Sequence, residues 1–351
     1  MLFKNCYKKD LTGFLFFISL FIISISCDST EPTDDLKPGR RDYTWTVDTI
    51  NTYAYYRMWG SSPTDLWATG SGDWDNSIAN FDGYRWLTFG VNGIINPRGL
   101  FGFDKYNVFV SAENGRIWRY NGNTWVLFAE LSKDGQSNFA FNDIWGISSN
   151  DFYVFGGLPD TIIGAFNNSV IAHYSNNNWS MLDTRAMNGI VAKVYKNSKD
   201  NKIYTLTYKA GGGIDPDSSI IYEYDQSNFK KIYSSIWTGG LQADIHLINN
   251  EVYFILGNQI AKRVNGQFQS FFTVDNSKFY QRIWGRNSKD IFLLMTDGLA
   301  HYNGSDIQYL FYFNITPRTQ IYGATLFERE VFFIVYESQT GLGISYHGKL
   351  N

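Results

Sequence analysis

The stretch Met58-Trp-Gly-Ser-Ser-Pro-Thr-Asp-Leu-Trp-Ala-Thr-Gly70, which continues to Ile78-Ala-Asn-Phe-Asp-Gly-Tyr-Arg-Trp86, decides the fold of this chain. It combines an aromatic-Gly pair, a turn that contains Asp, a run of residues typical of a β-strand, and a second turn before a closing Trp. Related copies begin near residues 58, 100, 144, 190, 245, 283 and 321, at a mean spacing of about 44 residues. Each copy holds four short apolar or alternating runs separated by turn residues. Four strands in a period of this length are typical of a propeller blade, so we predict an all-β, seven-bladed β-propeller with four-stranded antiparallel blades.

The copies are not equally clear. The third copy, Ile144-Trp-Gly146, keeps the aromatic-Gly pair, as does the sixth, Ile283-Trp-Gly285. In the fourth, fifth and seventh copies we align Ile190-Val-Ala192, Ile245-His246 and Ile321-Tyr-Gly323 with that pair. We expect a large flat side chain at this position to fill the space between neighbouring blades.

The two ends of the chain predict how the ring closes. The last copy stops three residues after Gly348, so its fourth strand is missing at the C-terminus. Residues 43–50 hold a spare fourth strand, in which Trp45 matches the closing Trp of other copies. We predict that this strand completes the last blade, with Trp45 and Val47 beside Tyr346, and that the propeller spans residues 43–351. Closure of this kind pairs strand edges that would otherwise be free.

Polar residues recur at fixed places in the copies. Asp65, Asp151 and Asp290 lie in the turn before the second strand, where Asp accepts backbone N–H bonds. His173 and His301 occupy equivalent places on third strands, and we expect a neighbouring turn to satisfy them. These residues are therefore interpreted as structural.

Composition excludes several classes of protein. Of the 351 residues, 44% are hydrophobic and 18% aromatic, which excludes a disordered chain, collagen and a coiled coil. The formal net charge of −3 gives no basic surface for nucleic acid. Two cysteines exclude a disulfide scaffold and a zinc site built on cysteines. We expect no cofactor.

The N-terminal segment predicts where the protein is located. Residues 1–26 have a basic start and a short apolar run that ends at small residues, as in a secretory signal peptide. Cys27 follows Ser26 directly, so the segment resembles a bacterial lipoprotein signal, and the resemblance implies that Cys27 is acylated and becomes the mature N-terminus. Residues 27–42 would then be a flexible polar tether. The resemblance implies a protein lipid-anchored to the bacterial cell envelope, at the outer membrane or cell surface; the alternative is an ordinary secretory signal and a secreted or periplasmic protein.

The repeat itself also resembles a known group. The pattern Trp-Gly-Ser-Ser-x-x-Asp-Leu-Trp-Ala-x-Gly of residues 59–70 is similar to repeats of bacterial secreted propellers, and distantly to Asp-box and WD-type blades. The strict Asp-box, Ser-x-Asp-x-Gly-x-Thr-Trp, is absent, so a sialidase-like activity is not implied. Because this architecture hosts many functions, the resemblance implies the fold and little about chemistry.

Long loops provide a first set of candidate site residues. Segments 70–77, 156–169 and 210–219 are longer than a simple hairpin needs, and such loops are often functional. Trp74, between Asp73 and Asp75, could stack on a sugar or on a peptide aromatic. Asp215 and Asp217 offer oxygens of the kind that Ca²⁺ prefers, which is only a weak signal for a metal site. The alternative in each case is a solvated loop.

A second set of candidates is basic. Five arginines precede the innermost strands of five blades and are expected around one mouth of the central channel, where they would favour an anionic ligand such as a carboxylated sugar or an acidic peptide. The alternative is that each arginine pairs with a neighbouring acid, for example Asp143 or Asp244. The five are Arg57, Arg98, Arg185, Arg282 and Arg318.

These patterns favour a binding or interaction module over an enzyme. No Ser-His-Asp order, His-rich metal spacing or Gly-rich phosphate loop stands out in the sequence. We expect a membrane contact through the lipid only, and a glycan, peptide or envelope protein as the partner. The alternatives are a polysaccharide-active enzyme, a hydrolase or lyase that uses carboxylates of the long loops, and a structural subunit of a surface complex.

Overall fold

The computed structural model describes residues 36–70, 74–159, 164, 166–213, 215–238, 242–314 and 319–351. The expected signal peptide and Cys27 lie outside these residues, as do Asp73, Arg318 and the side chain of Trp74. Within the described residues, no helix is long and apolar enough to cross a bilayer.

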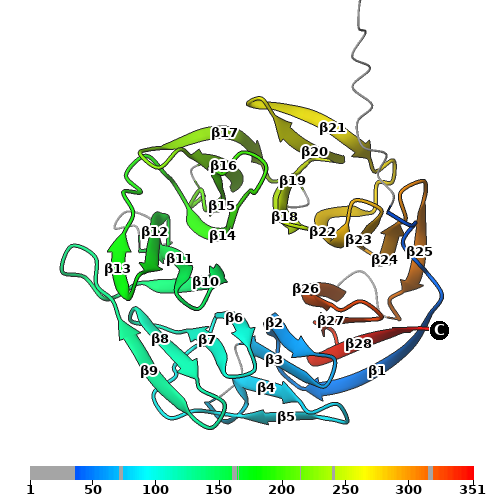
Figure 1. Ribbon diagram of the computed structural model, residues 1–351, viewed down its shortest axis with the longest axis horizontal. Coiled ribbons are helices and arrows are strands. Elements are labelled where there is room, and N and C mark those ends of the chain that lie inside the picture. The colour runs from blue at the N-terminus through cyan, green and yellow to red at the C-terminus, as the bar shows by residue number, and fades with distance from the viewer. Residues whose placement is uncertain are drawn as a thin grey trace, which may run out of the picture. The chain divides into compact units, whose positions relative to one another are not determined.

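The described residues form 28 strands in seven four-stranded antiparallel sheets, arranged as a ring (Figure 1). The prediction of a seven-bladed β-propeller is thus confirmed. Blades 1 to 3 consist of β2 (Tyr55–Ser62), β3 (Asp65–Gly70), β4 (Ile78–Phe81) and β5 (Trp86–Phe89); β6 (Gly99–Asp104), β7 (Asn107–Ser111), β8 (Arg116–Tyr120) and β9 (Trp125–Glu130); and β10 (Ala140–Ser148), β11 (Asp151–Leu158), β12 (Asn168–Ser175) and β13 (Asn178–Met181).

Blades 4 to 6 follow in the same order, and blade 7 combines both ends of the chain. Their strands are β14 (Ile190–Lys196), β15 (Ile203–Lys209), β16 (Ser218–Tyr224) and β17 (Phe229–Ile236); β18 (Ala243–Ile248), β19 (Glu251–Leu256), β20 (Gln259–Val264) and β21 (Gln267–Thr273); β22 (Phe279–Asn287), β23 (Asp290–Met295), β24 (Gly298–Tyr302) and β25 (Ile307–Tyr312); and β26 (Thr319–Leu326), β27 (Glu330–Glu337), β28 (Leu342–Leu350) and β1 (Tyr43–Asn51). A short 3₁₀ helix, η1 (Trp74–Asn76), lies between β3 and β4.

The core lies between the blades. Second strands are covered on both faces by neighbouring blades, which is why they are continuous apolar runs such as Val108-Phe-Val110 in β7. All residues of β23 are buried. Outermost strands such as β9 instead contain exposed residues. The packing therefore fixes the innermost strands around the axis.

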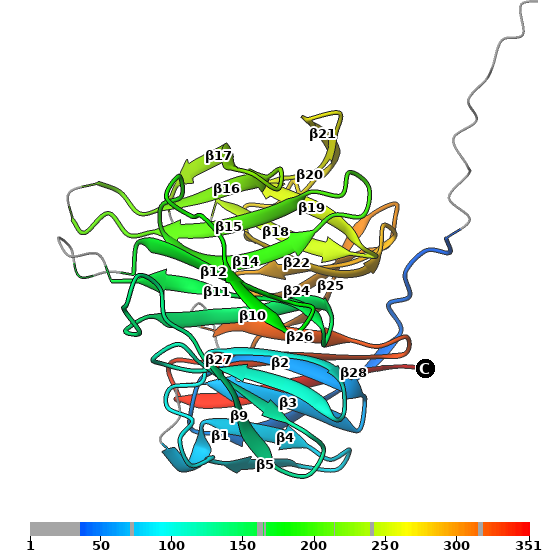
Figure 2. The same ribbon diagram turned by 60° about the vertical axis from the view of Figure 1, so that its left-hand side comes forward.

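The N-terminal strand closes the ring as predicted. Strand β1 pairs antiparallel with β28 (Figures 1 and 2). Trp45 lies opposite Gly348, and Val47 lies opposite Tyr346. The indole of Trp45 contacts Phe311 of blade 6 edge to face, with ring centroids 4.7 Å apart. The first strand of the propeller therefore supports both blade 7 and its contact with blade 6.

A polar pair joins the second and third strands of each blade, in the part of the chain that the structure describes. His173 is 2.7 Å from Asp151, and His301 is 2.7 Å from Asp290, so both predicted turn acids accept from third-strand side chains. In blade 4 the third-strand member, Glu223, is the acid, and its partner Lys202 is the cation. The other five pairs are Asp65–Asn80, Asn107–Arg119, Lys202–Glu223, Glu251–Lys262 and Glu330–His347.

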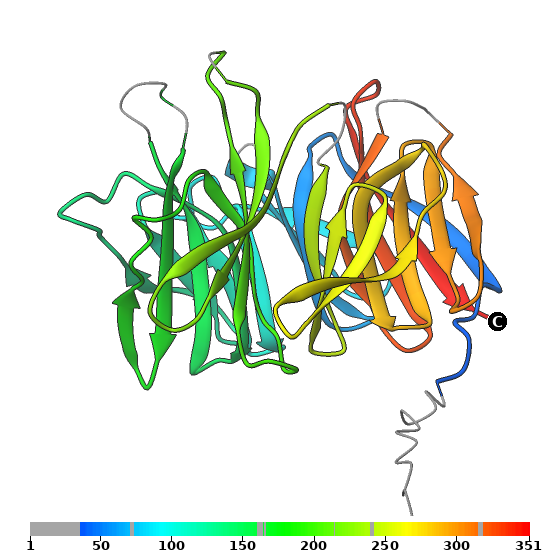
Figure 3. The same cartoon turned by 90° about the horizontal axis from the view of Figure 1, so that it is seen from above.

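Residues 37–42 differ from a free tether. We call Lys37–Asp42 the strap; it belongs to the same compact unit as the propeller. The amide of Gly39 donates to the carbonyl of Lys289 at 2.8 Å, and Asn351 donates to the carbonyl of Asp42 at 3.1 Å. Figure 3 shows the described part of the N-terminal segment close to the C-terminus. The chain is thus held against blades 6 and 7 from Gly39 onward.

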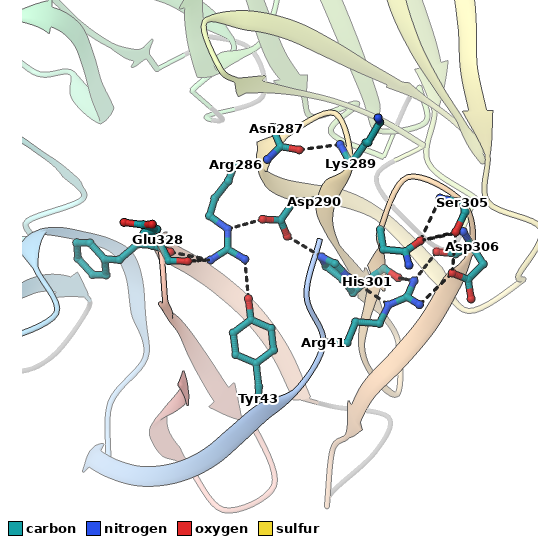
Figure 4. A network of polar contacts seen from close by, with 12 residues as sticks. Arg41, Tyr43, Arg286, Asn287, Lys289, Asp290, His301, Ser305, Asp306 and Glu328 are labelled. Carbon is teal, nitrogen blue, oxygen red and sulfur yellow. Dashed lines mark hydrogen bonds and ion pairs between the residues drawn. The ribbon is translucent and has the colours of Figure 1, made fainter. Parts of the chain in front are cut away.

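Arg41 is the main polar anchor of the strap (Figure 4). Its guanidinium donates to the carbonyl of His301 at 2.9 Å, to the ring Nδ1 of His301 at 3.3 Å and to Asp306 at 2.9 Å. His301 is fully buried and also bonds Asp290, which in turn accepts from Arg286. The strap is therefore continuous with the polar pair of blade 6.

We expect Gly39→Val to release the strap. A Cβ at this position would lie 2.6 Å from the Lys289 carbonyl oxygen and 2.7 Å from the His301 ring, so no side chain fits. The melting temperature should fall by about 2–4 °C, and amides of residues 37–42 should exchange with solvent faster by mass spectrometry. Lys37→Val is the matched control and should change neither quantity. Unchanged exchange in Gly39→Val would show that the strap is not held there.

Candidate functional site: the axial cavity

The two faces of the ring carry different connections. One face, which we call the loop face, carries the connections between blades and those between second and third strands. The other, the turn face, carries the remaining short turns. This assignment follows from the antiparallel order of the strands in each blade. Arg98 lies in the connection before β6 and therefore on the loop face, whereas the strap contacts turn-face residues such as Lys289.

A cavity of about 920 Å³ runs along the axis of the ring. Residues from all seven innermost strands line it, namely β2, β6, β10, β14, β18, β22 and β26. This volume is within the range of small-molecule sites in proteins. The cavity is therefore large enough for a ligand of several sugar or amino-acid units.

Irregular pairing directs several side chains at the axis. The ladder between first and second strands shifts register at one level in five blades, at Tyr56, Asn142, Ala192, Tyr322 and the stretch before Ile283. A β-bulge turns a side chain out of its regular direction and is common beside binding sites. All four named residues line the cavity, and so does Arg98 at the loop-face end.

The next level is a ring of seven positions, five of them charged, which we call the ion ring. Each innermost strand contributes one residue to this ring, namely the residue directly before its counterpart of Ile144 in the strand register. In blade order the members are Arg57, Gly99, Asp143, Lys193, Asp244, Arg282 and Gly323.

Ion pairs join members of the ion ring that belong to different blades. Arg57 of blade 1 donates to Asp143 of blade 3, with 2.6 Å between Nε and Oδ2. Gly99 of blade 2 lies between them, and a Cβ there would be 2.6 Å from the Asp143 Cα, so only glycine fits. Lys193 of blade 4 lies 2.7 Å from Asp244 of blade 5, whose side chain is fully buried.

Burial sets the protonation of these groups. Burial lowers the pKa of Lys193, and Asp244 opposes this effect. Burial also lowers the pKa of His246 well below its ordinary value, and the charges of Lys193 and Arg282 lower it further, so His246 is neutral at pH 7. Burial raises the pKa of Tyr208 to about 12, so its hydroxyl keeps its proton. The cavity thus offers cations and neutral hydroxyl groups to a ligand.

Aromatic side chains form the level beyond the ion ring. Trp59, Phe101, Trp145, Tyr195 and Trp284 hold equivalent positions in five blades and all line the cavity. His246 takes this position in blade 5, as the sequence predicted for that copy. Aromatic faces of this kind can contact a sugar ring or an apolar side chain of a peptide.

Two sequence alignments of the motif differ from the structure. In blade 4 the counterpart of Ile144-Trp-Gly146 is Val194-Tyr-Lys196, four residues after the expected Ile190. In blade 7 it is Ala324-Thr-Leu326 rather than Ile321-Tyr-Gly323. The error arises because the true motif positions of these two blades lack an aromatic-Gly pair, whereas Tyr322-Gly323, three residues early, resembles one.

The structure places the five predicted arginines differently. Arg57, Arg98 and Arg282 line the cavity, and Arg318 lies outside the described residues. Arg185 is not part of the cavity lining: its side chain is 89% exposed and pairs with Asp183. The alternative partners were also correctly named, since Asp143 pairs with Arg57 and Asp244 lies 3.6 Å from Arg282.

The described loop candidates do not line the cavity. Asp75 is an exposed residue of η1. Asp215 lies 3.5 Å from Lys209, and Asp217 accepts from the Gly211 amide at 2.9 Å. Over the ranges the structure describes, no group of three or more His, Cys, Asp or Glu residues is arranged to hold a metal ion.

Comparisons with known proteins support the fold. Virginiamycin B lyase from Staphylococcus aureus aligns with a TM-score of 0.63 and 11% identity, over 88% of this chain and 100% of that one. A structure of YCF48 bound to D1 peptide aligns with a TM-score of 0.60 and 14% identity, over 90% of this chain and 100% of that one. The extracellular domain of BT4673 from B. thetaiotaomicron aligns at 0.56 and 15%, over 86% of this chain and 39% of that one.

At these identities the likeness concerns the fold alone. No family model matches the chain, and no curated protein matches it.

Proposed function

We propose that this protein is a binding module that takes a peptide or glycan segment into the axial cavity from the loop face. The observation that carries the proposal is the lining of the cavity, in which cationic, hydroxyl and aromatic side chains follow one another along the axis. A propeller of similar fold has been solved with a bound peptide, and another is an extracellular domain. Both agree with a binding role.

The ion pairs of the cavity's carboxylates favour a binding role over acid–base catalysis. A glycoside hydrolase needs two carboxyl groups about 5–10 Å apart that face the substrate. The carboxylates of the ion ring, Asp143 and Asp244, are each within 2.8 Å of a cationic group. An enzyme that acts on polysaccharide is the alternative, and release of reducing or unsaturated ends from envelope polysaccharide would favour it.

We further propose that the propeller works at the bacterial envelope, held by lipid on Cys27. This rests on the residues before the described part of the chain and on the likeness to extracellular domains. Labelling of the expressed protein with a palmitate analogue, compared with Cys27→Ser, tests the anchor. Native co-purification with a stable set of envelope proteins would favour the structural-subunit alternative.

Blocking the cavity should abolish ligand binding. Asn142 lines the cavity at a bulge, and Asn142→Trp would fill the axis at that level. For a ligand identified from glycan and peptide arrays, we expect Kd to rise at least tenfold by isothermal titration calorimetry. Asn123→Trp, in an exposed turn between β8 and β9, is the matched control. Equal affinity in both variants would contradict binding in the cavity.

A further inference from the structure

The ion ring has one interruption in its pattern of charges. Around the axis the signs alternate from Arg57 through Asp143, Lys193 and Asp244 to Arg282, with Gly99 bridged by the pair on its two sides. Gly323 of blade 7 comes next, between Arg282 and Arg57. These two neighbours are both cations, so the position where the pattern calls for an anion has no side chain.

Arg282 is the least compensated cation of the ring. Asp244 is bound more closely by Lys193, at 2.7 Å, than by Arg282, whose Nε lies 3.6 Å away. Within the described residues this buried Nε makes no hydrogen bond. A terminal nitrogen of Arg282 reaches the blade 7 strand only at 3.5 Å, at the carbonyl of Ile321. Arg282 thus shares Asp244 with Lys193, and its other partner, the hydroxyl of Tyr208, is neutral. Within the described residues it forms no ion pair with a carboxylate that it does not share.

Gly323 lines the axial cavity next to blade 1. A Cβ on Gly323 would be 3.0 Å from the Met58 amide nitrogen and 3.4 Å from the Arg57 carbonyl carbon, so the glycine lies directly against blade 1. Tyr322 and Tyr56 lie on the loop-face side, with ring centroids 5.3 Å apart. Tyr208, Tyr280 and Arg98 line the same cavity. Hydroxyl and guanidinium donors thus line the cavity that Gly323 faces.

We infer that the ligand carries a carboxylate that binds at Gly323, where it pairs with Arg282 and completes the alternation of the ion ring. This inference rests on the proposed function and specifies its chemistry: the ligand is a small organic carboxylate, from an acidic sugar or an acidic peptide. Guanidinium groups suit this role because they bind carboxylates in a planar, two-bond geometry. Arg98 at the loop-face end adds positive charge that attracts the anion.

Simple probes test the carboxylate site directly. Benzoate and benzamide have nearly the same shape and differ in charge. We expect benzoate to raise the melting temperature of the mature protein saturably, by about 3 °C or more, and benzamide to bind at least tenfold more weakly. Gly323→Asp supplies the missing carboxylate from the chain itself and should abolish the benzoate effect. Arg282→Gln should abolish it by removing the cation.

The controls separate this site from general effects. Arg185→Gln removes an exposed arginine outside the cavity and should keep the full benzoate effect. Equal shifts with benzoate and benzamide, no saturable shift with benzoate, or a full shift in a folded Gly323→Asp or Arg282→Gln protein would overturn the inference. A ligand that is lost in Asn142→Trp yet kept in Gly323→Asp would leave the proposed function standing and refute the carboxylate site. Trigalacturonate and triglutamate then distinguish the sugar from the peptide source.

Discussion

A chain that begins at Asn51 should melt at least about 10 °C below a chain that begins at Lys37. The shorter chain lacks all of β1 except Asn51, and β1 pairs with β28 over its whole length. Loss of the Trp45 side chain alone should cost roughly 3 kcal/mol, and each lost backbone hydrogen bond about 1 kcal/mol. The edge of β28 would also be exposed for pairing with other chains. Differential scanning calorimetry of the two proteins measures the difference.

A third chain that begins at Tyr43 provides the control for this prediction. It keeps β1 and loses only the strap with its bonds from Gly39 and Arg41. We expect its melting temperature to lie within a few degrees of the longest chain, and size-exclusion chromatography to show monomers for both. Equal melting temperatures for the chains that begin at Asn51 and Tyr43 would refute closure by β1 as a source of stability.

The ring and its closure could be predicted because their causes are local or periodic. Each blade repeats the same turn residues and apolar runs, and the chain ends show which strand is missing. Blades 4 and 7 were misaligned because neither carries the aromatic-Gly pair at the equivalent place, where blade 4 has Tyr195-Lys196 and blade 7 has Thr325-Leu326. Ile190 and Ile321 look like motif residues, although Val194 and Ala324 hold the equivalent places.

The axial site could be predicted only in part. Arg57, Arg98 and Arg282 were identified from their place before the innermost strands, and all three line the cavity. Lys193 was missed because the misaligned blade 4 gave it no place near the axis. The alternation of charges was missed for a different reason. Its members come from different blades, far apart in sequence, and they become neighbours only when the ring closes.

The strap was predicted as part of a flexible tether because its contacts, like those of the ion ring, join residues that are far apart in sequence. Its composition is polar, and polar segments without apolar residues usually cannot fold alone. Its contacts come from distant turns of blades 6 and 7, and Gly39 and Arg41 fit residues more than 200 positions away. Composition predicts whether a segment can form its own core, and it does not predict whether the segment binds to another part of the chain.

Removal of Asp244 should destabilise the protein strongly. Its side chain is fully buried, bonds Lys193 at 2.7 Å and lies 3.6 Å from Arg282. Asp244→Ala leaves both cations in the interior without this carboxylate, and breaking a buried pair in this way costs about 3–5 kcal/mol. Urea unfolding at pH 7 measures the loss. The exposed Asp183→Ala, which removes the partner of Arg185, is the matched control and should leave the urea midpoint unchanged.

The loss in Asp244→Ala should shrink as the pH rises. Burial already lowers the pKa of Lys193 below 10.5, and Asp244 opposes that shift, so its removal lowers the pKa further. Between the folded pKa and 10.5 the unfolded chain binds more protons than the folded one, and stability therefore rises with pH across this window. We expect the difference from the wild type to be smaller at pH 9.5 than at pH 7. In Lys193→Met/Asp244→Leu the lysine cannot titrate, and the pH dependence attributable to it should disappear. A deficit in Asp244→Ala that stays constant over this range would show that the uncompensated charge of Lys193 is not its cause.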